Sequence, residues 1–67
     1  MMFISLIEAD TKIKAWVSME SIVLIRDWGD ITEITLSTGA RIQADQPFKE
    51  FCETIATALR EYGSKSG

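Results

Sequence analysis

Five short β-prone segments, each followed by turn residues, and one segment with helical periodicity limit the folds open to this chain. Apolar and polar residues alternate at 11–17 and 31–37, as in a strand whose successive side chains point to opposite faces. Segments 2–8, 21–27 and 40–44 complete the set. The short loops between them favour antiparallel neighbours. The sequence therefore predicts an α+β fold: an antiparallel β-meander of about five strands, with one C-terminal amphipathic helix packed on one face.

The closing helix is predicted by a stripe of apolar side chains at helical spacing. The stripe consists of Phe48, Phe51, Cys52, Ile55, Leu59 and Tyr62. Asp45 is expected to cap the helix and Pro47 to lie in its first turn, where the missing N–H of proline costs nothing. Gly63 is expected to end the helix. Residues 1–67 are then a single small domain, with 63–67 as a frayed tail.

The composition argues against most enzyme classes. The 67 residues include no histidine and one cysteine, Cys52, and they lack a glycine-rich phosphate loop. A conventional catalytic triad is therefore impossible, and we expect no enzyme activity, no cofactor and no metal site. A small enzyme with a site between subunits, built from acidic turn residues, is the least favoured alternative. One unpaired cysteine and no membrane-length apolar stretch favour a cytoplasmic protein without a membrane span.

Two segments are apolar on both faces, which one helix cannot cover. In segment 2–8, Phe3 and Ile7 oppose a second apolar set, and segment 22–25 is apolar throughout, with Ile22 and Leu24 expected to oppose Val23 and Ile25. Either the sheet curls into a half-barrel or its second face meets another chain. We therefore expect a homo-oligomer, with a dimer favoured. The candidate interface residues are Met2, Ile4, Leu6, Trp16, Ile22, Leu24 and Trp28.

A second hypothesis is nucleic-acid binding by a sheet face where aromatic and basic residues alternate. The candidate residues are Lys12, Lys14, Trp16, Arg26, Trp28 and Arg41. Ten acidic residues oppose seven basic ones, for a formal net charge of -3. Because this net charge repels phosphate, we expect no strong nucleic-acid binding. A non-enzymatic, self-associating interaction protein with an unknown protein partner is the favoured function.

Three short motifs resemble two known families. They are Ile22-x-x-Ile25, then Ile34-Thr35-Leu36-Ser37-Thr38-Gly39-x-x-Ile42, then a helix that opens Phe48-x-x-Phe51. The chain resembles the small flagellar FlbD/SwrD-type protein family over nearly its whole length, which implies a bacterial or phage protein. Residues 13–59 also resemble the first half of a LytTR-type DNA-binding domain, whose DNA-contacting part has no counterpart here. The turn Glu8-Ala9-Asp10 departs from the flagellar pattern, where an Asn-Gly-like turn is expected. Neither resemblance assigns a functional residue.

Overall fold

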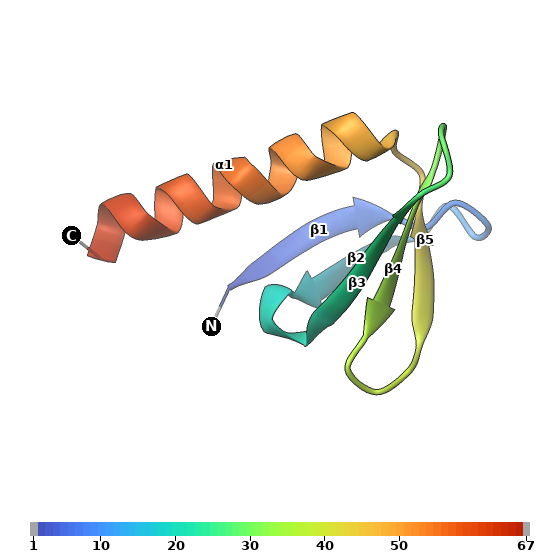
Figure 1. The fold of residues 1–67 in the computed structure, drawn as a ribbon, viewed down its shortest axis with the longest axis horizontal. Coiled ribbons are helices and arrows are strands. Elements are labelled where there is room, and N and C mark those ends of the chain that lie inside the picture. Colours follow the sequence, from blue (N-terminus) through green and yellow to red (C-terminus); the bar gives the residue numbers. More distant parts are fainter. Residues whose placement is uncertain (1, 67) are drawn as a thin grey trace.

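Five strands and one long helix make up the part of the chain that the computed structural model describes, residues 2–66, with side chains described for 2–61. The elements in chain order are β1 (Phe3–Ile7), β2 (Lys14–Ser18), the 3-10 helix η1 (Met19–Ser21), β3 (Ile22–Asp27), β4 (Thr32–Leu36), β5 (Arg41–Ala44) and α1 (Phe48–Ser66). All strand pairs are antiparallel. The predicted α+β fold is confirmed (Figure 1).

The strands form two sheets rather than one continuous meander. β1 pairs with β2, and β3, β4 and β5 form a separate sheet in that order. η1 lies between β2 and β3, and these two strands do not pair. Instead the end of β1 meets β5: Ala9 N–H donates to the Gln43 carbonyl and Asp45 N–H to the Ile7 carbonyl, both at 2.8 Å. The strands therefore curl around one core, which corresponds to the half-barrel alternative.

The core lies where the inner faces of both sheets meet α1. Its buried residues are Ile4, Leu6, Val17, Ile34, Ala44 and Phe51. The hairpin of β1 and β2 supplies three of them, β4 and β5 supply two, and α1 supplies Phe51, which is fully buried. α1 lies along β1 (Figure 1). Burial of these apolar side chains against both sheets is the main force that holds the fold together.

A β-bulge in β3 changes which residues face the core. Ile22 is paired with Leu36, and Leu24 with Thr35, so Val23 is the additional residue on the β3 side. An extra residue shifts the alternation of side chains by one position. Ile22 and Ile25 therefore both pack against the core, while Val23 and Leu24 are exposed. The expectation that Ile22 and Leu24 share a face is wrong, because strict alternation holds only without a bulge.

The helix differs from the expectation at both ends. Asp45 does not act as a helix cap: it pairs with Lys12, and α1 begins at Phe48, directly after Pro47. α1 continues to Ser66, so the expected end at Gly63 is wrong, and residue 67 lies outside the described residues. A glycine in a helix costs only about 1 kcal/mol and does not force an end.

The apolar stripe of α1 is only partly buried, because the helix is longer than the strands beneath it. α1 has 19 residues and β1 has 5. At typical rises per residue these correspond to about 28 Å and about 17 Å. Phe48, Cys52 and Ile55 are half-buried, and Leu59 is 53% exposed. The side chain of Tyr62 lies outside the described residues.

Candidate interaction surfaces

The outer face of the β1–β2 hairpin carries an apolar patch. Ser5 pairs with Trp16 across the two strands, so Phe3 and Ile7 lie diagonally on either side of the indole on the same face. Phe3 is 48% exposed, Ile7 41% and Trp16 65%. We call these three residues the hairpin patch. The sequence-based interface included Trp16 but not Phe3 or Ile7, although the alternation in 2–8 already placed them together.

Charged residues border the hairpin patch on β2 and η1. Lys14 Nζ lies 5.8 Å from the centroid of the Trp16 ring, within the range of a cation–π contact. Two residues beyond Trp16, the Ser18 hydroxyl donates to Glu20 Oε1 at 3.0 Å. Hydrogen bonds from its own backbone N–H and from Ser18 lower the pKa of Glu20. The patch therefore has a cation at one end and an ionised carboxylate at the other.

The outer face of the three-stranded sheet is polar apart from the exposed Leu24, and it is organised around a buried carboxylate. Glu33 is paired with Arg26 on β3 and Gln43 on β5, and it is only 6% exposed. The indole Nε1–H of Trp28 donates to Glu33 Oε1 at 3.1 Å. Arg41 and Gln43 lie at alternate positions of β5 and share this face. Trp28 is 58% exposed, but its polar end is satisfied within the chain.

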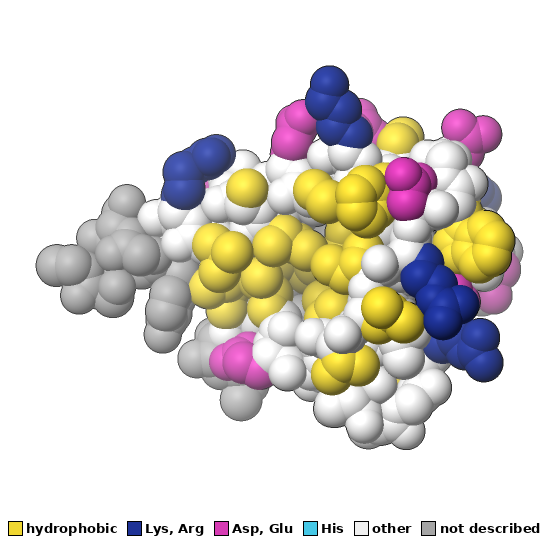
Figure 2. Space-filling model, viewed as in Figure 1, with side chains coloured by type: hydrophobic (Ala, Val, Ile, Leu, Met, Phe, Trp, Pro, Cys, Tyr) yellow, Lys and Arg dark blue, Asp and Glu magenta, His cyan; other side chains and the backbone are white. Residues whose placement is uncertain are grey.

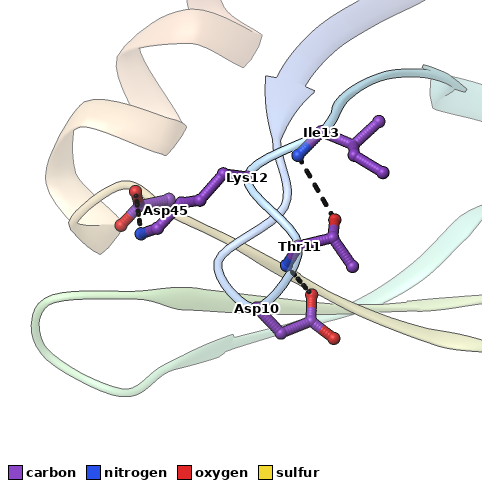
Figure 3. A network of polar contacts seen from close by, with 5 residues as sticks. All are labelled: Asp10, Thr11, Lys12, Ile13 and Asp45. Atoms are coloured by element: carbon purple, nitrogen blue, oxygen red, sulfur yellow. Dashed lines mark hydrogen bonds and ion pairs between the residues drawn. The ribbon is translucent and has the colours of Figure 1, made fainter.

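The turn between β1 and β2 is fastened to the segment that leads into α1. Lys12 Nζ lies 2.8 Å from Asp45 Oδ2, and Thr11 N–H donates to Asp10 Oδ1 at 2.9 Å within the turn (Figure 3). Lys12 has φ 62, in the left-handed region that a side chain usually avoids. The Glu8 carbonyl accepts the Lys12 N–H at 2.9 Å, which closes the turn. A turn that departs from Asn-Gly chemistry therefore still uses a left-handed residue.

The candidate nucleic-acid residues do not form one basic face. Lys14 and Trp16 lie on the outer face of the hairpin, whereas Arg26 and Arg41 lie on the outer face of the other sheet. Lys12 lies in the turn of the hairpin and pairs with Asp45, and Arg26 is the cross-strand partner of the buried Glu33. Two of the candidate basic residues are thus next to a carboxylate.

The candidate interface residues divide between the core and the surface. Ile4 and Leu6 are 4% and 5% exposed. They are part of the core of the chain, so they are not free to contact a partner. The inner face of β1 is covered by α1, which the sequence could not decide. Ile22 is half-buried against the core. Leu24, Trp16 and Trp28 remain exposed.

An apolar hollow lies beside the helix, and Met2 is part of it. Met2, Met19, Glu20 and Leu59 line this hollow between η1 and α1. Figure 2 shows hydrophobic side chains gathered below α1 on the face turned to the viewer.

The described residues contain neither a metal-binding cluster nor a helix able to cross a membrane. Among them, no group of three or more His, Cys, Asp and Glu side chains is arranged to hold a metal ion. No helix in the described part of the chain is long and apolar enough to cross a membrane. No protein-family model, curated protein or solved structure matches this chain. Function is therefore inferred from the exposed surfaces of the two sheets.

Proposed function

We propose that this chain is a non-enzymatic, self-associating interaction module that meets a second copy of itself through the hairpin patch. The observation that carries the proposal is the arrangement of Phe3, Ile7 and Trp16 as exposed neighbours on one rigid hairpin face. Aromatic side chains are enriched at the centres of protein interfaces, where they bury large areas at a small entropic cost. The three-stranded sheet offers less, because its buried Glu33 would have to enter any interface formed there.

A second copy is favoured over another partner for two reasons. A chain of 67 residues with a small buried core gains little stability alone, and association is a common supplement when disulfides and metals are missing. The patch is also bordered by charges of both signs, Lys14 and Glu20. A surface with both signs at its border is able to complement itself across a two-fold axis.

A bacterial or phage origin, a cytoplasmic location and membership of the flagellar FlbD/SwrD-type family belong to the same proposal. In the motif on which the resemblance rests, Gly39 has φ +94 in the turn after Ile34-Thr35-Leu36, as in β-hairpins of many families. A glycine at this position of the motif is what a left-handed turn requires. The single Cys52 is half-buried and unpaired, in keeping with a reducing compartment.

Sedimentation equilibrium across a range of protein concentrations tests the function. We expect the mass to rise from 7.5 kDa toward twice that value as concentration increases. Trp16→Ala weakens the association about tenfold or more, because truncating an aromatic anchor at an interface costs about 2 kcal/mol. Ile13→Ala is the matched control: Ile13 is 60% exposed in the same hairpin but precedes β2. A wild-type mass of 7.5 kDa at every concentration would contradict the proposal.

A further inference from the structure

The outer edge of β2 is free to pair with another strand. Glu8 N–H donates to the Ile13 carbonyl and Met19 N–H to the Met2 carbonyl, which fixes the alternation of hydrogen bonds between β1 and β2. By this alternation the backbone groups of Lys14, Trp16 and Ser18 point away from β1. In the described part of the chain β2 pairs with β1 alone. A row of donors and acceptors is therefore available at this edge.

The other free edge, that of β3, is less suited to pairing. The bulge at Val23 interrupts its regular ladder, a device that commonly protects edge strands from association. β2 keeps a regular register over its whole length. Its one protective feature is Lys14, a charge that usually discourages edge pairing unless an opposite charge meets it.

We propose that β2 pairs antiparallel with β2 of a second copy, with Trp16 on the two-fold axis. This inference rests on the proposed function and narrows it: Trp16 is the member of the hairpin patch that the second copy contacts, while Phe3 and Ile7 on β1 lie beside it on the same outer face. The backbone groups that point outward are those that such a register joins: Trp16 with Trp16 of the second copy, and Lys14 with Ser18 of the second copy. The two indoles meet on the outer face, next to Phe3 and Ile7, as a cross-strand aromatic pair.

The charges at the edge complement each other in this register. Lys14 lies opposite Ser18 of the second copy, and the Ser18 hydroxyl holds the Glu20 carboxylate at 3.0 Å. Lys14 therefore meets Glu20 of the second copy, and the two-fold axis repeats the pair on the other side of the indoles. Glu20 is ionised at neutral pH, as an exposed carboxylate normally is, and its hydrogen bonds lower its pKa further. Lys14 would otherwise discourage pairing at this edge, but in this register it meets an opposite charge. It therefore favours pairing with a copy of this chain over pairing with other strands.

A charge-exchange experiment tests the register. Lys14→Glu and Glu20→Lys are each expected to weaken the dimer about fivefold or more, since each places like charges opposite one another twice. The double variant carries both changes and restores opposite charges, so its association is expected to return to within about twofold of wild type. Lys49→Glu is the control, because Lys49 is an exposed lysine on α1 and not on β2 or η1. Circular dichroism verifies that each variant is folded.

Amide hydrogen exchange of the wild-type protein gives a second measurement that needs no variant. As concentration rises, the amides of Lys14, Trp16 and Ser18 are expected to gain protection, while those of Ala15 and Val17 stay unchanged because they already bond to β1. A dimer whose association is insensitive to both single changes, and whose Trp16 amide gains no protection, overturns the edge pairing but leaves self-association standing. A chain that is monomeric at all concentrations overturns both.

Discussion

The two sheets expose a tryptophan to similar extents but use it differently. Trp16 on the hairpin is 65% exposed, and Trp28 beside the three-stranded sheet is 58% exposed. The indole N–H of Trp28 is bonded to the buried Glu33, whereas among the described residues none accepts a hydrogen bond from the indole of Trp16. Trp28 thus serves the fold by satisfying a buried carboxylate. Trp16 contributes nothing comparable inside the chain, so its exposed ring is available to a partner.

The comparison shows that exposure alone does not identify an interaction surface. What separates the two tryptophans is whether the chain itself satisfies the polar end of the ring. The indole N–H of Trp28 is bonded to the buried Glu33. Trp16 has Phe3 and Ile7 as diagonal neighbours on its face and Lys14 Nζ 5.8 Å from its ring. An apolar surrounding lowers the cost of removing water when another chain approaches.

The largest expected effect comes from Phe51, the helix residue that is buried in the core between the two sheets. Phe51→Ala should reduce the free energy of unfolding by about 3–5 kcal/mol, because the fully buried ring joins the inner faces of both sheets. Leu59→Ala is the matched control on the same helix, and since Leu59 is 53% exposed its effect should stay below about 1 kcal/mol. Urea unfolding followed by circular dichroism measures both. Equal midpoints for wild type and Phe51→Ala would show that α1 does not close the core.

A smaller effect distinguishes the two tryptophans directly. Trp28→Phe keeps an aromatic ring but removes the donor to Glu33, so it should cost about 1–2 kcal/mol in unfolding free energy. Trp16→Phe removes no hydrogen bond found among the described residues and should stay within about 0.5 kcal/mol. The measurement is made in urea at a concentration where the protein is monomeric. Equal costs for the two substitutions would show that the hydrogen bond from Trp28 to Glu33 does not stabilise the fold.

The sequence predicts the inner and outer faces where alternation is unambiguous. In β2, Val17 is buried and Trp16 exposed, as expected from the pattern. In β3 the run Ile22 to Ile25 is apolar at every position, so no pattern identifies Val23 as a bulge. The β3–β4 register that results pairs Arg26 with Glu33, and the turn after β3 brings Trp28 onto the same carboxylate. Sequence spacing alone contains no such information.

The division into two sheets is also beyond the sequence. Residues 18–20 read as a short connection that suits pairing of the strands on either side, yet η1 separates β2 from β3. Long-range contacts decide how the strands divide between the two sheets, because the end of β1 pairs with β5. In β1, Ile4 and Leu6 face the core while Phe3 and Ile7 face outward. Because both faces of β1 are apolar, only the position of α1 settles which one is buried.

The smallest expected effect concerns nucleic acid, and it tests both faces at once. Trp16→Phe and Trp28→Phe each leave one tryptophan, so its fluorescence reports on one sheet during titration with single-stranded oligonucleotides. We expect no quenching at submicromolar concentration and physiological salt from either face. The net charge is -3, and Glu33 lies between the strands that carry Arg26 and Arg41. Quenching that weakens steeply with added salt, seen for one tryptophan and not the other, would instead assign nucleic-acid binding to that sheet.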